Sequence, residues 1–472
     1  MDISFRRARE WFLGLAFLLT AAGAPGSGRA SSAAPGPAFE PFVLQPDDRV
    51  LVLAPHPDDE VIGCAGIIQR SRAMGLPVRV VFLTYGDNNQ WSFAVYRKHP
   101  VLEPEAVRQM GMIRHGEAVN AARAMGLEPD QLVFLGYPDF GTLHIWAEHW
   151  NREPAFESML TRVRAVPYPN AYRPGAPYKG EEILADLTAV IRDFNPTRIF
   201  LSHPADQNCD HRSLYLFTRV ALWNLEDELR PALHPYLVHF RRWPMPRGYR
   251  PEAAARPPRA LAEAVPWRRF ALTDGEAGTK LDAIHRHRTQ FGYAAKYLLS
   301  FVRAGELFGD LPAARLGPGA ELKTDEEIDG KEEEALPDQL TDEEQASFVG
   351  IEWRAVRREA GALALTVRLS RPLARTVGLS LYVFGYRKDQ PFAGLPKLHV
   401  RFGALRHEIL DQSAQLPPDS VTVERTGKTI TVRVPLALLG DPGLVMTSAR
   451  TYLGDVPLDW ISWRVLDLRG RP

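Results

Sequence analysis

The chain has 472 residues, 45% of them hydrophobic and 24% charged, which is typical of a globular protein long enough for two or three domains. Lys and Arg number 57, as do Asp and Glu, so the net charge is zero and no basic excess favours a nucleic-acid partner. Two cysteines are too few for a disulfide framework.

The first 30 residues have the pattern of a secretory signal peptide. Arginines precede an apolar run from Trp11 to Ala24 that ends in small residues. The run is short for a membrane helix, so we expect an exported protein, periplasmic or secreted, without a stable membrane span after cleavage. An uncleaved membrane anchor is the alternative. Residues 31–45, rich in Gly, Pro, Ser and Ala, predict a linker.

The first strand of the next domain is predicted at Val50 to Ala54, an unbroken apolar run typical of a strand buried on both faces of a parallel sheet. His56, Asp58 and Asp59 follow it directly. Ligands bind at the carboxyl ends of such strands, and imidazole with carboxylate suits Zn²⁺. The alternative is a helix N-cap, which would explain one carboxylate only.

The elements that follow alternate between strand and helix, which predicts a Rossmann-like α/β fold with a mostly parallel sheet and helices on both faces. A long polar and aromatic connection, residues 85–104, suits sugar binding or core covering. The predicted strands and helices are Val78–Thr84, Glu105–Gly126, Gln131–Gly136, Glu181–Phe194, Arg198–Ser202, Pro235–Phe240 and 278–304. No Gly-x-Gly-x-x-Gly follows the first strand, which disfavours dinucleotide binding.

A second polar loop follows the strand Arg198–Ser202. It carries His203, Asp206, Asn208, Asp210 and His211. Two such loops at one edge of a parallel sheet can meet over a single ion. Each loop also has a cysteine nearby, Cys64 and Cys209; we expect Cys64 to be a small buried hydrophobe, and a bridge between the two is the alternative.

Residues 313–345 contain an acidic, aromatic-free run and predict a solvated linker between domains 46–312 and 346–472. The last domain has short alternating runs separated by Pro and Gly, which predict an antiparallel β-sandwich. The runs are Phe348–Val356, Ala362–Leu369, Thr376–Phe384, Lys397–Phe402, Thr429–Val434 and Trp460–Leu466. This part resembles carbohydrate-binding modules.

The domain 46–312 resembles the PIG-L/LmbE-type N-acetylglucosaminyl deacetylases. The resemblance lies in His-Pro-Asp-Asp-Glu at 56–60 and His-Pro-x-Asp-x-x-x-Asp-His at 203–211. Further matching stretches are Arg114–Glu117, Gly136–Asp139 and Lys280–Ile284, the last followed by His287 and Gln290.

This resemblance implies one zinc ion per chain, held by His56, Asp59 and His211, with Asp58 as the general base for attack of zinc-bound water on an amide. It also implies substrate contacts for Arg114, on the predicted helix Glu105–Gly126, and for Asp139, which follows the strand Gln131–Gly136. Three further residues, Asp206, Asp210 and His203, would orient the ligands from behind.

Many family members carry a histidine where this chain has Asn208. An amide can donate a hydrogen bond to an oxyanion but cannot transfer a proton near neutral pH. We expect Asn208 to act as such a donor. The alternatives are that His203 or His287 transfers the proton, or that activity is reduced.

The expected function is removal of N-acetyl groups from N-acetylglucosamine-type sugars of an exported glycan or glycoconjugate. The partner is therefore a carbohydrate, polymeric or conjugated, and no nucleic acid is expected. Two alternatives remain open: a deacylase of another amide-bearing glycoside, and a non-catalytic glycan-binding protein.

Overall fold

The computed structural model describes residues 39–88, 103–325, 342–454 and 456–469. The predicted signal peptide lies outside these ranges, as do most of the 85–104 connection and the acidic run of the predicted linker. In the described part of the chain, no helix combines the length and the apolar character needed to cross a membrane.

A five-stranded sheet in the order β4-β3-β2-β5-β6 forms the centre of the first region, and all its neighbouring strands are parallel. Its strands are β2 (Val50–Ala54), β3 (Val78–Thr84), β4 (Leu132–Tyr137), β5 (Arg198–Ser202) and β6 (Ala232–Tyr236). The chain builds outward from β2 in one direction and from β5 in the other. The boundary between β2 and β5 is therefore the point of the sheet at which ligands bind in such folds.

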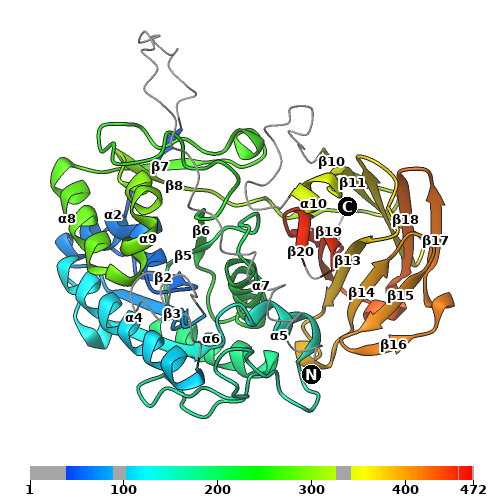
Figure 1. Ribbon diagram of the computed structural model, residues 1–472, viewed down its shortest axis with the longest axis horizontal. Helices are drawn as coiled ribbons and strands as arrows, with labels where there is room; N and C mark the ends of the chain where they lie inside the picture. Colours follow the sequence, from blue (N-terminus) through cyan, green and yellow to red (C-terminus); the bar gives the residue numbers. More distant parts are fainter. Residues whose placement is uncertain (1–38, 89–102, 326–341, 455, 470–472) are drawn as a thin grey trace, which may run out of the picture.

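Helices cover both faces of this sheet. The helices are α2 (Asp59–Ala73), α4 (Pro104–Ala124), α5 (Thr142–Glu148), α6 (Gly180–Phe194), α7 (Cys209–Asn224), α8 (Asp274–Arg286) and α9 (Arg288–Leu298). Helix α8 packs against α2 and α4, whereas α7 packs against α5 and α6. Figure 1 shows α2, α4, α8 and α9 together on one side and α7 on the other. The predicted fold class is confirmed.

Two predicted elements of this region have different bounds in the structure. The helix expected at 278–304 is two helices that meet at His287, where ψ is 62°. The strand expected at 235–240 lies at 232–236, with Pro235 tolerated because β6 is an edge strand. Beyond the end of the strand, the backbone N–H groups of Val238 and His239 donate to the Asp206 carboxylate instead of to a neighbouring strand.

The predicted linker 31–45 needs correction at its end. Strand β1 (Glu40–Pro41) pairs with β7 (Arg268–Ala271), which pairs with β8 (Gly305–Phe308). Phe42 and Leu44 are each only 5% exposed and belong to the hydrophobic core. The Pro- and Ala-rich surroundings of these two residues hid this core contact in the sequence.

The C-terminal region contains two sheets whose strands pair in an antiparallel manner, except β9 with β21. One sheet has the order β10-β11-β12-β18-β17 and the other β16-β15-β14-β13-β19-β21-β9, with β20 paired to β19. The strands are β9 (Ala314–Arg315), β10 (Glu321–Asp325), β11 (Ile351–Glu359), β12 (Ala362–Leu369), β13 (Val377–Tyr386), β14 (Lys397–Phe402), β15 (His407–Asp411), β16 (Ala414–Leu416), β17 (Thr422–Thr426), β18 (Thr429–Pro435), β19 (Leu444–Leu453), β20 (Val456–Trp460) and β21 (Arg464–Asp467). A short helix, α10 (Asp342–Ala346), precedes β11. The predicted sandwich is confirmed.

The predicted linker 313–345 also needs correction, because its first part belongs to the sandwich. Strand β9 pairs with β21, and β10 pairs with β11. Leu316 is buried and Leu322 packs on the same core. The acidic run that follows concealed these short apolar positions. The strand expected at Trp460–Leu466 is likewise divided, because β20 ends at Trp460 and β21 begins at Arg464.

The hydrophobic core of the first region continues across the junction into the C-terminal region, whose sandwich also has a core of its own. Trp146 and Trp150 at α5 lie against the C-terminal rings of Phe384 and Phe392, with the Trp146 and Phe384 centroids 5.9 Å apart and those of Trp150 and Phe392 4.8 Å apart. Both tryptophans are fully buried. Figure 1 shows α5 and α7 facing the sandwich.

Candidate metal centre and active site

The candidate metal centre consists of His56, Asp59 and His211. His56 follows β2 and Asp59 begins α2, whereas His211 lies in the first turn of α7, which follows β5. Because β2 and β5 are adjacent and parallel, both loops leave the sheet at the same edge. The ligand atoms of the three residues lie within 4.8 Å of one another. The structure therefore brings the three predicted ligands together.

The Asp59 carboxylate lies between the two imidazoles. Its Oδ2 atom is 3.1 Å from His56 Nδ1 and 3.1 Å from His211 Nε2, and all three side chains are buried. Burial acts to raise the pKa of Asp59, but His211 and His56 hold it well below its ordinary value. Burial acts to lower the pKa of His211, yet Asp206 and Asp59 raise it to about 9. The negative charges of Asp59 and Asp206 therefore stabilise positive charge at this position.

The donor atoms fit a divalent zinc ion. Both ring nitrogens of His211 are buried, and among the described residues neither makes a hydrogen bond, although each lies near a carboxylate oxygen. A cation between Asp59 and the two imidazoles would provide the missing partner for Nε2. Two imidazole nitrogens and one carboxylate oxygen form a three-ligand set that catalytic zinc uses.

Each imidazole turns its other nitrogen toward a carboxylate. His211 Nδ1 lies 3.2 Å from Asp206 Oδ2. His56 Nε2 lies 3.2 Å from both Asp139 Oδ1 and Asp210 Oδ2, and these three residues form a second group with metal-ligand atoms within 4.8 Å. Carboxylates placed in this way fix the orientation of a metal-binding imidazole and raise its basicity.

These carboxylates are themselves anchored to backbone N–H groups. Asp206 accepts from Asn208 N at 2.9 Å, Val238 N at 3.0 Å and His239 N at 2.9 Å. Burial opposes ionisation, but His211, His239 and these bonds lower the pKa of Asp206. It therefore ties the loop after β5 to the loop after β6.

Asp210 and Asp139 are anchored on the opposite side of the centre. Asp210 accepts from Phe140 N at 2.6 Å and from both the backbone N–H and the hydroxyl of Thr142. Asp139 accepts from Asn88 N at 2.9 Å. Asp139 is only 5% exposed and lies beside His56. Its substrate contact stays a prediction, and its observed surroundings are those of a residue that orients the imidazole.

Asp58 is turned to a different partner from its neighbour Asp59. Its φ of 131° is a conformation that side-chain-bearing residues rarely adopt, and Glu60 Oε2 accepts its backbone N–H at 2.9 Å. Its Oδ1 lies 3.6 Å from Arg114 Nη2, and 15% of the side chain is exposed. Burial raises the pKa of Asp58 to about 7 against the lowering effect of Arg114.

Arg114 holds the loops around Asp58 in place. The buried guanidinium donates to Gly86 O at 2.8 Å and to Pro57 O at 2.7 Å. Gly86 has φ +64°, and a Cβ there would lie 2.2 Å from Arg114 Nη1, so only glycine fits. The carboxylate of Glu117, on the same helix, accepts from the backbone N–H and the hydroxyl of Thr289. The substrate contact of Arg114 stays a prediction.

Asn208 is the N-cap of α7. Its side-chain oxygen accepts from Asp210 N at 2.8 Å, which leaves the amide nitrogen as its donor group. The capping bond places the first turn of α7, and with it His211. The role of Asn208 as an oxyanion donor is untested.

The two histidines considered as proton carriers have other contacts. His203 Nδ1 accepts from Ala205 N at 3.1 Å, and the ring stacks on Trp267. Burial lowers its pKa to about 3, so this histidine is neutral. His287 Nε2 lies 3.1 Å from Glu60 Oε1.

Two residues near the centre, Glu60 and His239, were given no role from the sequence. Glu60 links the Asp58 backbone to His287, and its place in the His-Pro-Asp-Asp-Glu motif was an available signal. His239 lies after β6, with its ring edge-on to that of His211 at 4.8 Å. The only indication of His239 in the sequence was its position, as a polar residue near the end of a predicted strand of the same sheet. Cys64 and Cys209 are both free, so the alternative of a bridge is not supported.

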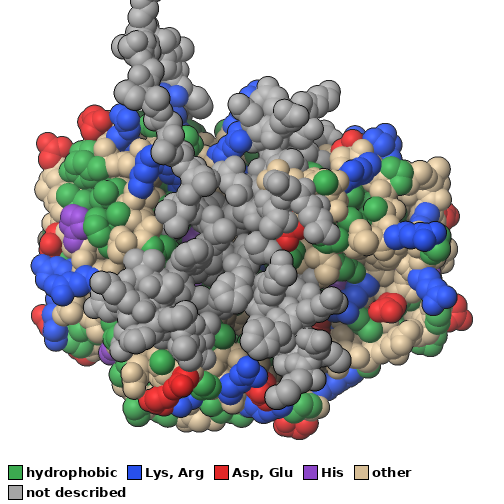
Figure 2. All heavy atoms as spheres, viewed as in Figure 1, with side chains coloured by type: hydrophobic (Ala, Val, Ile, Leu, Met, Phe, Trp, Pro, Cys, Tyr) green, Lys and Arg blue, Asp and Glu red, His purple; other side chains and the backbone are tan. Residues whose placement is uncertain are grey.

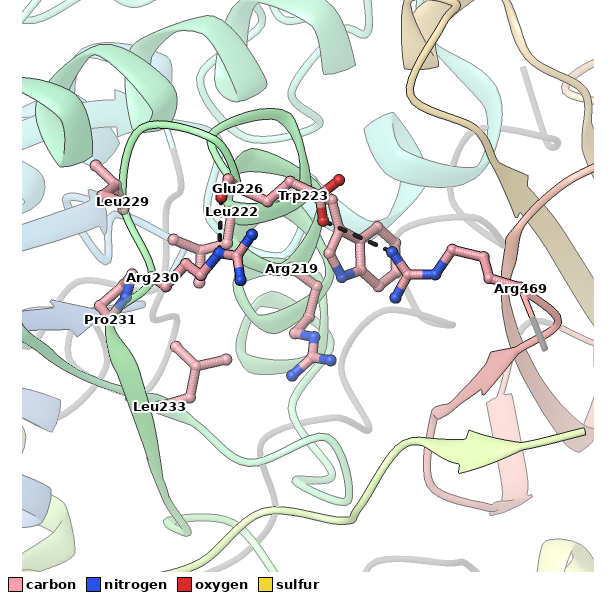
Figure 3. Close-up of a pocket in the computed structure, with 9 residues that line it drawn as sticks. All are labelled: Arg219, Leu222, Trp223, Glu226, Leu229, Arg230, Pro231, Leu233 and Arg469. Atoms are coloured by element: carbon pink, nitrogen blue, oxygen red, sulfur yellow. Dashed lines mark hydrogen bonds and ion pairs between the residues drawn. The ribbon is translucent and has the colours of Figure 1, made fainter. Parts of the chain in front are cut away.

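A separate pocket of about 880 Å³ lies at the other end of α7. It extends from Leu233 at the start of β6 to Arg469 of the C-terminal region (Figure 3). Two of its arginines have acidic partners, with Arg219 at 3.4 Å from Asp310 and Arg469 at 3.0 Å from Asp467. Because α7 begins at the metal centre, this pocket is not part of it. Figure 2 shows Lys and Arg side chains interspersed with Asp and Glu over the described surface of one face.

Comparison with known proteins finds similarity to sugar deacetylases over part of the chain. Residues 51–222 match the family model PIG-L, described as GlcNAc-PI de-N-acetylase. A curated relative, the 1D-myo-inositol 2-acetamido-2-deoxy-alpha-D-glucopyranoside deacetylase of Streptomyces avermitilis, is 27% identical over 238 residues, which are 48% of this chain and 70% of the relative.

Similar solved structures include the N,N'-diacetylchitobiose deacetylase of Pyrococcus horikoshii, with 21% identity and a TM-score of 0.35 over 55% of this chain and 82% of that chain. A deacetylase of the teicoplanin biosynthesis pathway has 14% identity and a TM-score of 0.36 over 55% and 96%. Residues 51–222, which match the PIG-L family model, contain the whole candidate metal centre.

Proposed function

We propose that this protein is a zinc-dependent hydrolase that removes the N-acetyl group from N-acetylglucosamine-type sugars of an exported glycan or glycoconjugate. The observation that carries the proposal is the Asp59 carboxylate between two buried imidazoles, with Asp58 beside it on a strained backbone. The family match, whose description names a de-N-acetylase, supports the reaction type. The signal-like N-terminus supports export.

His56, Asp59 and His211 would hold the ion, and Asp206, Asp139 and Asp210 would keep the two imidazoles in the required orientation. When bound, zinc supplies Lewis-acid chemistry that lowers the pKa of water and polarises an amide carbonyl.

Asp58 is the group that moves the proton. Its carboxylate is not needed to hold the ion, and it remains partly exposed, so it can accept a proton from the attacking water. The same carboxyl group then returns that proton to the nitrogen of the leaving sugar amine. Arg114, anchored to Gly86 and Pro57, keeps Asp58 in place through the cycle.

Asn208 stands at the same edge of the sheet, at the start of α7. With its oxygen engaged by Asp210 N, the amide NH₂ group is the part that can face the substrate. We propose that it donates a hydrogen bond to the oxygen on which negative charge develops.

The direct test is acetate release by the purified, zinc-loaded protein from chitooligosaccharides and from a panel of other acetylated glycans and glycosides. Release from N-acetylglucosamine-containing substrates, lost on zinc removal and regained on its return, is the expected result. Acyl release only from another amide-bearing glycoside would replace the substrate class. Sugar binding without release from any substrate would indicate a glycan-binding protein and contradict the proposal.

A further inference from the structure

A short segment of the C-terminal region lies against the loop that carries His211. The segment 460–463 runs from the last residue of β20 to the residue before β21. Arg212 of α7, which follows His211 in the sequence, is fully buried beneath this segment. Arg212 donates to Ile461 O at 2.8 Å and to Trp460 O at 3.1 Å. Its guanidinium carbon lies 4.2 Å from the centre of the Trp460 ring. The charged side chain of Arg212, next to the predicted ligand His211, therefore contacts the backbone of the sandwich.

The same arginine also binds its own loop. Its Nε atom donates to Asp206 O, the backbone carbonyl of the residue whose carboxylate faces His211 Nδ1. A second contact crosses between the regions nearby, because Trp463 N donates to Pro204 O at 3.1 Å. The loop from Pro204 to Arg212 is thus attached to the C-terminal region at two points.

The segment 460–463 is firmly held on its own side. Ile461 O accepts from Ser448 Oγ at 2.9 Å, and Ile461 N donates to Ala449 O. Both backbone polar groups of Ile461 are therefore bonded to residues of β19. Arg354 Nη2 donates to Ser462 Oγ at 3.2 Å. A planar guanidinium that donates to three carbonyls has little freedom, so the position of this segment is transmitted to the loop.

We propose that Arg212 is a positioning residue of the metal centre, and that the C-terminal sandwich contributes to metal affinity through residues 460–463. The inference rests on the proposed function only in that His56, Asp59 and His211 bind a divalent ion. It assigns the sandwich a structural part in the centre, in addition to any contact it makes with glycan.

A general loss of docking between the regions would be a different explanation, and the chain offers a matched control. Arg401 of β14 pairs with Glu148 of α5 at 3.2 Å. This pair also joins the two regions but touches neither the loop 203–212 nor the segment 460–463. Arg401→Gln therefore removes a contact between the regions without removing the attachment of the loop.

The test compares zinc affinity of full-length Arg212→Gln, Arg212→Lys and Arg401→Gln by competition with a chromogenic chelator. We expect Arg212→Gln to bind zinc about 10–100-fold more weakly, as for other losses of outer contacts, and Arg401→Gln to match the unmodified protein. Arg212→Lys should fall between them, because an ammonium keeps the charge but cannot reach three carbonyls.

The absorption spectrum of the cobalt-loaded protein gives a readout that stability alone does not move. A changed ligand-field spectrum in Arg212→Gln, but not in Arg401→Gln, is expected. If Arg212→Gln does not fold, Trp460→Leu keeps the backbone carbonyl that Arg212 binds, removes the ring that contacts Arg212 and Arg450, and should weaken zinc binding severalfold. Unchanged zinc affinity and cobalt spectrum in a folded Arg212 or Trp460 variant would overturn the inference. These metal measurements stand even if no deacetylase activity is found.

Discussion

The two loops that carry the candidate histidine ligands begin with the same pattern, His-Pro-x-Asp, but use it differently. In the first loop, His56 and Asp59 both face the metal centre. In the second, His203 stacks on Trp267, and Asp206 stands behind His211 rather than in front of it. The same pattern at adjacent strand ends therefore supplies candidate metal ligands in the first loop. In the second loop it supplies residues that hold the ligand His211 in position.

The source of support also differs between the loops. The first loop is held by residues of its own region, above all Arg114, which donates to Pro57 O. The second loop is held by Asp206 from within and by the C-terminal region through Arg212. The comparison shows that the motif determines which imidazole and carboxylate groups are present, whereas the hydrogen bonds from neighbouring groups determine how those side chains are oriented.

The largest effect is expected from the two candidate histidine ligands, His56 of the first loop and His211 of the second. His56→Ala should lose stoichiometric zinc binding and turnover together, and His211→Ala should do the same, because each removes one of three ligands. His203→Ala should retain its zinc, since the ring of His203 faces Trp267. Metal analysis after dialysis measures all three. Loss of zinc in a folded His203→Ala variant would show that the two loops are more alike than we describe.

Asp58→Asn should separate proton transfer from metal binding. We expect zinc content to remain, whereas kcat falls by about 10²–10⁴-fold, because an amide cannot accept the proton. Acetate release together with metal analysis measures this. Hydrolysis at the unmodified rate would remove Asp58 as the base.

Asp206→Asn and Asp139→Asn compare the supports behind the two imidazoles. Asp206 accepts from three backbone N–H groups in addition to facing His211, so an amide there also loses acceptors, and we expect zinc affinity to fall about 10–100-fold. Asp139→Asn should have a smaller effect, because Asp210 Oδ2 faces the same nitrogen of His56 at 3.2 Å. Chelator competition measures both, and equal losses would contradict the difference in support.

The smallest effect concerns the junction between the regions. Lys397 is fully buried over the Trp150 ring, and burial lowers its pKa from 10.5 to about 7. Between these two values the unfolded chain binds a proton that the folded chain does not, so stability rises with pH across this window.

Lys397→Met removes that titration. The Tm of the variant relative to the unmodified protein should therefore be highest at or below pH 7 and decrease as the pH approaches 10. Thermal unfolding over this pH range measures the difference. A difference in Tm that does not change with pH would contradict a buried, largely neutral amine.

Much of the first region could be predicted because its strands are continuous apolar runs. Val50–Ala54, Val78–Thr84 and Arg198–Ser202 have the predicted bounds, and the polar loops behind two of them contain the candidate centre. The motif spacing also indicated which histidines and carboxylates could meet at one sheet edge.

Contacts that join distant segments could not be read from local pattern. His239 reaches His211 only because β6 lies beside β5, and its segment has no motif. Strand β19 was not predicted, since Ser448 and Arg450 interrupt its apolar character, yet buried Ser448 binds Ile461 O. The bonds of Arg114 to Gly86 O and Pro57 O likewise join segments that are far apart in the sequence.

The aromatic junction formed by Trp146, Trp150, Phe384 and Phe392 constrains how this protein can be recombined with its relatives. A chimera that takes the sheet from one parent and the sandwich from another must inherit matching rings on both sides. A fragment of residues 51–222 would lack Phe384 and Phe392 and would expose Trp146 and Trp150 to solvent, which favours aggregation. For this chain, the unit to exchange is therefore the pair of regions with its matching rings.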